Sequence, residues 1–173
     1  MRTPLVAGNW KMNKTAAEAR RLVTEQLPAL QAVKNVQRVL CPPFPALMTV
    51  AELLAGTDIG LGAQNLHWEA SGAFTGEVSP QMVREFCQYV IIGHSERRTY
   101  FGETDQTVNR RIKAALGIGL IPIVCIGETL AENEAGQTAD VLKRQIVEGL
   151  KDLTIEQGAA LVIAYEPVWA IGT

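Results

Sequence analysis

Three side chains of complementary chemistry stand at the ends of apolar runs in this 173-residue sequence. Glu166 follows the run 161–164 and precedes Pro167, His94 follows the run 89–93, and Lys11 follows the run 5–8. A carboxylate can act as a base, a neutral imidazole can donate a hydrogen bond to an oxygen, and an ammonium group can stabilise negative charge. Together these groups suit the abstraction of a proton next to a carbonyl.

Each of these residues also has a plainer interpretation. Asn9 and Lys11 are two positions apart and would share one face of a strand, converging on an anionic oxygen, but their spacing alone favours a solvated turn. His94 would have a lowered pKa if a helical turn begins beside it, or it could simply bond a neighbouring carboxylate. Glu166 could be a solvated loop residue.

Other classes of chemistry find less support in the sequence. No His, Asp and Glu cluster has metal-ligand spacing, so metal-assisted hydrolysis fits poorly, and no Ser or Cys nucleophile lies in a GxSxG-like turn. Cys41, Cys87 and Cys125 are odd in number and lack CxxC spacing, which favours buried thiols in a reducing compartment over zinc ligands or disulfides.

Composition limits the kinds of partner that the protein is expected to bind. A net charge of −2 without a basic cluster argues against nucleic-acid binding. No apolar run approaches the roughly 18 residues of a membrane span, and the first residues lack the apolar region of a secretion signal. We therefore expect a cytoplasmic protein. Its 173 residues, 47% of them hydrophobic, are enough for one domain with a sizeable core.

Short β-type runs alternate with amphipathic helical patterns. The six expected strands are residues 5–8, 36–41, 59–64, 89–93, 121–126 and 161–166. Five helices are expected: one from a capping box at Thr15 and Glu18, one over 45–54, one from Ser79 and Pro80, one through 108–117 and one through 141–150. Several strand runs are continuously apolar, as in strands covered on both faces.

This alternation predicts a parallel sheet in an α/β fold. An open doubly wound sheet and a TIM (β/α)8 barrel both fit. The absence of a GxGxxG or Walker-type motif favours the barrel. Because eight units need about 250 residues, we expect residues 1–173 to form a single partial barrel domain with about six strands and five helices, ending within a lid loop after the sixth strand.

The connection formed by residues 65–78 is long for a strand-to-helix loop. It carries Leu66, Trp68, Ala73 and Phe74. Apolar residues on such a loop suggest docking, most simply against a second copy of the chain. The alternative is a surface loop folded on itself.

Six sequence blocks together resemble the triosephosphate isomerase family, most closely its bacterial branch. They are GNWKMN (8–13), GAQN (62–65), GAFTGE (72–77), IIGHSERR (91–98), VCIGET (124–129) and AYEPVWAIGT (164–173). They span the whole chain. The resemblance implies interconversion of dihydroxyacetone phosphate and glyceraldehyde 3-phosphate through an enediol, in glycolysis and gluconeogenesis.

The resemblance also implies roles for individual residues, which are the known ones of this family. Glu166 would move the proton, neutral His94 would polarise the carbonyl, and Lys11 would stabilise negative charge. Asn9 and Lys11 would bind substrate together with Gly172, and the resemblance implies neither a cofactor nor a metal.

Further residues would support the site or join two copies of the chain. Ser95 would hold Glu166 in an open position, and Glu96 would be a supporting residue. A homodimer would form through loop 65–78, with Thr75 steadying Asn9 of the other copy and Glu77 pairing with Arg98 of the other copy.

The family pattern continues past Thr173 with the rest of a lid and two more strand–helix units, whose loops hold much of the substrate phosphate. Two hypotheses follow. In one, the sequence is part of an ordinary isomerase. In the other, the 173-residue chain is an inactive, association-prone fragment that needs the missing C-terminal third. A barrel enzyme with unrelated chemistry is disfavoured by the density of matching blocks.

Overall fold

The computed structural model describes residues 3–172, and within that range the chain forms one six-stranded parallel sheet. The strands pair in sequence order, from β1 to β6. They are β1 (Leu5–Asn9), β2 (Gln37–Cys41), β3 (Gly60–Ala63), β4 (Tyr89–Ile92), β5 (Ile121–Ile126) and β6 (Val162–Tyr165). All six lie within or overlap the expected runs, so the predicted strands and parallel sheet are confirmed.

Eight α-helices occur among residues 3–172, more than the five expected. They are α1 (Ala16–Ala32), α2 (Leu47–Leu54), α3 (Pro80–Phe86), α4 (Ser95–Phe101), α5 (Asp105–Gly117), α6 (Leu130–Glu134), α7 (Thr138–Gly149) and α8 (Ile155–Ala160). Two 3-10 turns, η1 (Phe44–Ala46) and η2 (Val168–Ala170), complete the set. The count of five was therefore wrong: α4, α6 and α8 are too short for the apolar periodicity used to predict helices.

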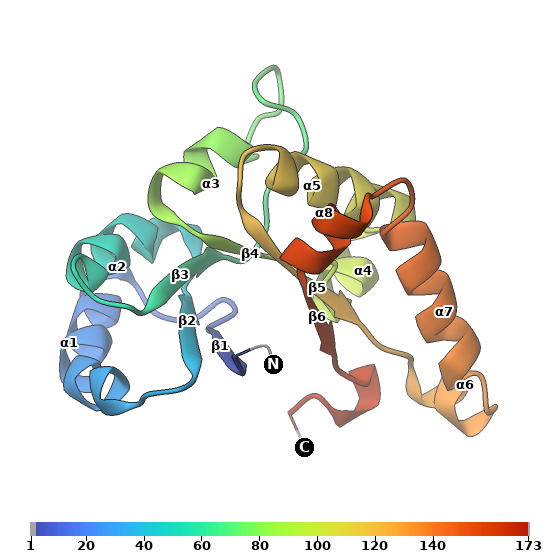
Figure 1. Cartoon of the computed structure of the whole chain (residues 1–173), viewed down its shortest axis with the longest axis horizontal. Helices are drawn as coiled ribbons and strands as arrows, with labels where there is room; N and C mark the ends of the chain where they lie inside the picture. Colours follow the sequence, from blue (N-terminus) through green and yellow to red (C-terminus); the bar gives the residue numbers. More distant parts are fainter. Residues whose placement is uncertain (1–2, 173) are drawn as a thin grey trace.

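The sheet curls into an arch, with α1, α2, α3, α5 and α7 along its outer side (Figure 1). β1 and β6 border the opening, and within residues 3–172 each pairs with a single neighbouring strand. Their outward side chains are uncovered: Val6 is 64% exposed and Ile163 is 40% exposed. The fold is thus an incomplete barrel, as expected.

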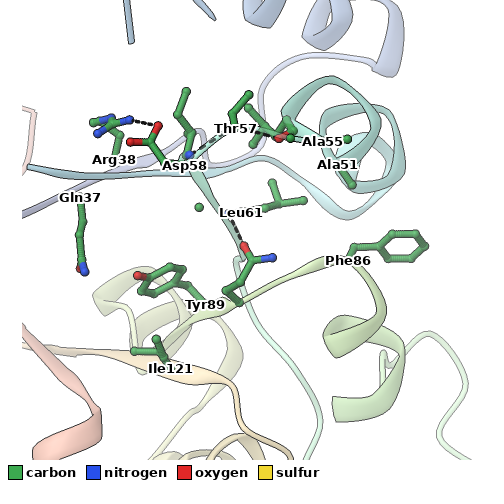
Figure 2. Close-up of a pocket in the computed structure, with 15 residues that line it drawn as sticks. Gln37, Arg38, Ala51, Ala55, Thr57, Asp58, Leu61, Phe86, Tyr89 and Ile121 are labelled. Carbon is green, nitrogen blue, oxygen red and sulfur yellow. Dashed lines mark hydrogen bonds and ion pairs between the residues drawn. The ribbon is translucent and has the colours of Figure 1, made fainter. Parts of the chain in front are cut away.

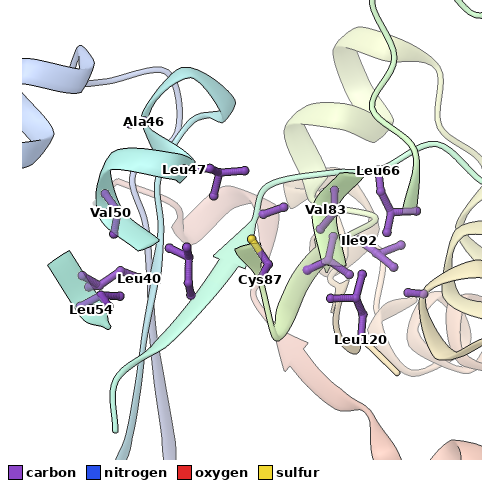
Figure 3. Packing of buried hydrophobic residues seen from close by; sticks show 14 of the residues in the cluster. Leu40, Ala46, Leu47, Val50, Leu54, Leu66, Val83, Cys87, Ile92 and Leu120 are labelled. Atoms are coloured by element: carbon purple, nitrogen blue, oxygen red, sulfur yellow. The ribbon is translucent and has the colours of Figure 1, made fainter. Parts of the chain in front are cut away.

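Alternate strand residues build two apolar clusters on the two faces of the sheet, as the period of two requires. On β4, Val90 and Ile92 face the helices, while Tyr89 and Ile91 face the inside of the arch. Figure 3 shows the larger outer cluster, in which side chains of the sheet meet those of the covering helices.

Two of the expected helix starts, those marked by capping residues, are confirmed. Thr15 and Glu18 form the reciprocal capping box at the start of α1, and the Ser79 hydroxyl accepts a hydrogen bond from the Met82 amide at the start of α3. The helix expected over 45–54 begins instead with the turn η1, and α2 starts at Leu47.

The outer core supplies a test of how strongly this packing stabilises the arch. Ile112 on α5 is 0% exposed, whereas Ile155 on α8 is 88% exposed. We expect Ile112→Ala to lower the free energy of unfolding by about 2–5 kcal/mol and Ile155→Ala to change it by no more than about 0.5 kcal/mol. Urea unfolding followed by circular dichroism measures both, and equal effects would contradict this assignment of the core.

Candidate active site

The carboxyl ends of β1, β4 and β6 bring the predicted chemical groups to one rim of the sheet. Asn9 and His94 line two cavities there. The first, of about 300 Å³, is also lined by Lys11 and Glu96. The second, of about 260 Å³, is also lined by Glu166. Lys11 and Glu166 therefore lie on either side of a shared pair, Asn9 and His94.

His94 is the N-cap residue of α4, which confirms that a helical turn begins beside it. The Glu96 amide donates to Nδ1 of His94 over 3.2 Å. Nδ1 is therefore an acceptor, and in the neutral ring the proton is on Nε2. This hydrogen bond fixes both the tautomer and the ring orientation.

The pKa of His94 lies below its ordinary value of 6.5. The main cause is burial, since the residue is only 7% exposed. The Glu96 carboxylate opposes the decrease, and the Lys11 ammonium adds to it. The expected direction is confirmed, but burial rather than the helix terminus dominates.

Glu166 approaches the protonated nitrogen of this ring. Its Oε2 lies 4.0 Å from His94 Nε2, and its side chain is 53% exposed. On the other side, Lys11 Nζ lies 2.8 Å from Glu96 Oε1. The cation and the base thus border two different cavities, and the hydrogen-bond donor His94 lines both, so that a ligand reaching into both cavities could meet all three groups.

The backbone of Lys11 is in the left-handed region, with φ of 54°. Such a conformation is costly for a residue with a side chain. The side-chain amides of Asn9 and Gln64 stabilise it by hydrogen bonds. Oδ1 of Asn9 accepts from the Lys11 amide at 3.0 Å. Nε2 of Gln64 donates to the carbonyls of Lys11 and Cys41, each at 2.9 Å. Gln64 was not among the predicted site residues; the sequence signals for it were its place at a strand end and its position in the block GAQN (62–65).

Glu128 is a second residue that the sequence analysis did not assign. It is 0% exposed, and it accepts hydrogen bonds from Trp169 Nε1 at 3.1 Å and from the Tyr165 hydroxyl at 3.2 Å. Burial alone would raise its pKa, but hydrogen bonds from Trp169, Tyr165 and Asn133 outweigh burial and hold the pKa below its ordinary value. Glu128 therefore anchors the segment that follows Glu166.

Ser95 and Arg98 lie close to Glu166. All three line a small gap beside β5, and no hydrogen bond joins Ser95 to Glu166 within residues 3–172. Arg98 is held inside its own chain, by Asp105 Oδ1 at 2.6 Å and by the Gly93 carbonyl at 2.9 Å.

The remaining predicted residues lie on loops. Thr75 and Glu77 are exposed on loop 65–78, and Phe74 there is 43% exposed. Leu66, expected on the loop surface, is instead 0% exposed, because it packs in the outer core. Gly172 is exposed near the described end of the chain, with φ of 79°; Thr173 lies outside the described residues.

A larger cavity, of about 510 Å³, lies at the opposite rim (Figure 2). Arg38 there is paired with Asp58 and donates to the Val36 carbonyl at 2.9 Å. Neither His94, Glu166 nor Lys11 lines this space. Its size therefore does not mark the site; the chemistry lies at the carboxyl ends of the strands, as parallel α/β folds require.

No group of three or more His, Cys, Asp or Glu side chains within residues 3–172 is arranged to hold a metal ion. In the same range, none of the helices combines the length and the apolar character needed to cross a membrane.

Known proteins match this chain along its length. A family model described as triosephosphate isomerase matches residues 4–173. The triosephosphate isomerase of Carboxydothermus hydrogenoformans is 57% identical over the whole chain, which covers 69% of that protein. Those of Symbiobacterium thermophilum and Moorella thermoacetica are 58% and 57% identical, with 68% and 70% covered. The chain belongs to the triosephosphate isomerase family.

Membership of the triosephosphate isomerase family agrees with the resemblance drawn from the six sequence blocks. The chain spans about 70% of the length of these relatives. The structure agrees with this partial coverage, because it forms the arch of a barrel with two strand edges left unpaired.

The environment of His94 predicts how its ring titrates. Because burial disfavours the imidazolium ion, the pKa stays below 6.5, and protonation destabilises the folded chain as the pH falls through that range. Glu96→Gln removes the strongest opposing influence and should lower the pKa further. Titration of the ring protons by NMR measures both values, with the exposed Glu85→Gln as the control. A midpoint at or above 6.5 in the unaltered chain would contradict the lowered pKa of His94.

A second prediction concerns the close packing at Gly127, where an added Cβ atom would lie 2.0 Å from the carbonyl oxygen of Glu166. Gly127→Ala must displace Glu166, and a displacement of about 1 Å can cost roughly 10²-fold in rate. Gly158→Ala is the matched control, because nothing lies within 4 Å of its added Cβ. Isomerase assays compare the two, and an unchanged rate in Gly127→Ala would show that the base tolerates this shift.

Proposed function

We propose that the chain is an isomerase that interconverts dihydroxyacetone phosphate and glyceraldehyde 3-phosphate, acting within glycolysis and gluconeogenesis in the cytoplasm. The observation that carries this proposal is the 4.0 Å approach of Glu166 Oε2 to His94 Nε2, beside the cavity that Lys11 lines. Membership of the family supports the same reaction.

In the proposed reaction, Glu166 removes a proton from the hydroxyl-bearing carbon next to the carbonyl, which gives an enediol once the carbonyl oxygen has taken up a proton. Glu166 then returns its proton to the former carbonyl carbon, while the hydroxyl oxygen of the other carbon loses its proton and becomes the new carbonyl. The Nε2 proton of His94 bonds the carbonyl oxygen, so that negative charge can develop there without a charged ring. Use of a glutamate base with a neutral histidine is the known pattern of this family. The reaction moves protons only and needs neither a metal nor a redox cofactor.

Lys11 supplies the fixed positive charge of the site. Its ammonium group is paired with Glu96 at 2.8 Å, and both side chains are more than a third exposed. A phosphorylated substrate could therefore compete with Glu96 for this cation at small cost. Asn9 and Gly172 would complete the substrate contacts, and Ser95 would hold Glu166 when the site is open.

We further propose a homodimer formed through loop 65–78. Thr75, Glu77 and the partly exposed Phe74 project there, while the hydrogen bond from His67 N to the carbonyl of Val78, at 2.8 Å, closes the base of the loop. Thr75 would steady Asn9 of the partner copy, and Glu77 would pair with Arg98 of the partner copy.

The exposed edges support an alternative for the 173-residue chain on its own. With Val6 and Ile163 uncovered on β1 and β6, the arch could be association-prone and catalytically silent until a polypeptide covers its open side. An assay with and without a synthesised C-terminal third of the C. hydrogenoformans relative separates the two readings. Activity that appears only with the added segment supports this alternative.

Replacement of the base tests the function itself. Glu166→Gln should lower kcat by roughly 10²- to 10⁴-fold, the usual contribution of a general base. Glu156→Gln, an exposed carboxylate outside both cavities, is the control and should retain the full rate. All proteins are prepared in parallel from a host that lacks its own isomerase. A near-normal rate for Glu166→Gln would remove this residue from the role of base.

A further inference from the structure

Gln145 holds the residue that follows β5 by two hydrogen bonds. Its side chain projects from α7 and is only 5% exposed. Oε1 accepts from the Gly127 amide at 2.9 Å, and Nε2 donates to the Gly127 carbonyl at 3.1 Å. Two bonds from one planar amide to one residue fix both the position and the rotation of that backbone segment.

Gly127 is also the residue against which the backbone of Glu166 rests. There is no room for a Cβ atom between them, since it would lie 2.0 Å from the Glu166 oxygen and 2.8 Å from the Glu166 carbonyl carbon. Any movement of Gly127 towards β6 therefore pushes directly on the residue that carries the proposed base.

The neighbours of Gly127 bond the same segment. The Glu166 amide donates to the Ile126 carbonyl, and the Val168 amide donates to the Glu128 carbonyl, both at 2.9 Å. Residues 126–128 thus hold residues 166–168 by backbone hydrogen bonds, and Gln145 in turn holds Gly127, the central residue of 126–128.

We propose that Gln145 is a positioning residue: by fixing Gly127, it holds the backbone of Glu166 at the place from which the carboxylate faces His94. It acts through Gly127 and lines neither cavity of the site. The catalytic part of this inference rests on the proposed isomerase function, whereas the geometric part does not.

A general stabilising role is the competing explanation, and Asn109 provides the matched comparison. Asn109 on α5 also uses an amide to hold backbone, since its Nδ2 donates to the carbonyls of Gly149 and Lys151 at 3.0 and 2.9 Å. These carbonyls lie at and just beyond the end of α7, and Asn109 lines neither cavity of the site. Asn109→Leu should therefore reduce stability without a specific effect on residues 166–168.

The first measurement is hydrogen exchange by mass spectrometry on the 173-residue chain. A buried hydrogen bond changes an opening equilibrium by about two- to tenfold. Gln145→Leu loses both bonds and should speed exchange in a peptide covering 162–172 by roughly ten- to a hundredfold relative to a peptide within α1. Gln145→Glu keeps the shape and the acceptor for the Gly127 amide, so a smaller increase is expected, and this variant carries the test if the leucine variant does not fold.

The second measurement is steady-state kinetics. Gln145→Leu should lower kcat by roughly ten- to a hundredfold with KM changed less than about threefold, because Lys11 and Asn9 are untouched. Asn109→Leu should leave both constants unchanged per folded molecule. The kinetics are measured with and without the added C-terminal third. If the unaltered chain shows no turnover in either case, its proposed function fails, but the exchange comparison still decides the positioning role. Equal exchange increases in both peptides, or the same pattern in Asn109→Leu, would overturn the proposal.

Discussion

Every strand of this sheet runs in the same direction, and the candidate site depends on that constraint. Parallel pairing brings all six carboxyl ends to one rim, so Asn9, His94 and Glu166 become neighbours although they are far apart in the sequence. The curl of the sheet brings β1 and β6 towards each other: Ala7 of β1 and Ala164 of β6 line the same cavity. Local sequence determines which residues reach the rim, and the curl determines how far apart they stand.

Amide side chains then fix the backbone where the strand ladder ends. Beyond the last paired residue, N–H and C=O groups have lost their strand partners and need others. Asn9 and Gln64 supply them around Lys11, and Gln145 supplies them at Gly127. An amide suits this task because it both donates and accepts without bringing a charge to a site whose working groups are themselves charged.

The elements that carry this rim were largely predictable. Apolar runs gave the strands because continuous burial leaves a strong compositional signal, and the capping residues Thr15 and Ser79 gave helix starts because the cap is a local interaction. The short helices α6 and α8 were missed, although Thr129 with Glu132 and Thr154 with Gln157 form the same reciprocal caps. A search for caps without an apolar stripe would have found both.

From the sequence alone, placement at strand ends also identified four candidate site residues: Asn9, Lys11, His94 and Glu166. What the sequence could not supply was contact between residues distant along the chain. Gln64 reaches a carbonyl 53 positions away, and Gln145 reaches one 18 positions away. No local pattern marks either pairing, because the first depends on the distance between the ends of β1 and β3, with β2 between them, and the second on the distance between a helix and a strand end.

The two rims of the sheet show why chemistry, rather than volume, locates the site. At the amino-terminal rim, Arg38 is already paired with Asp58 and with a backbone carbonyl. The larger cavity there therefore offers a ligand little charge that is not already paired. At the carboxyl rim, Glu166 is half-exposed, and the Lys11–Glu96 pair is open to solvent. Glu166 and Lys11 therefore remain accessible to a ligand, the first because its side chain is half-exposed and the second because its ion pair with Glu96 is open to solvent. Rigid backbone support with free side chains is the arrangement that lets a site exchange partners with a substrate, and here that support comes from Gln64 and Gln145.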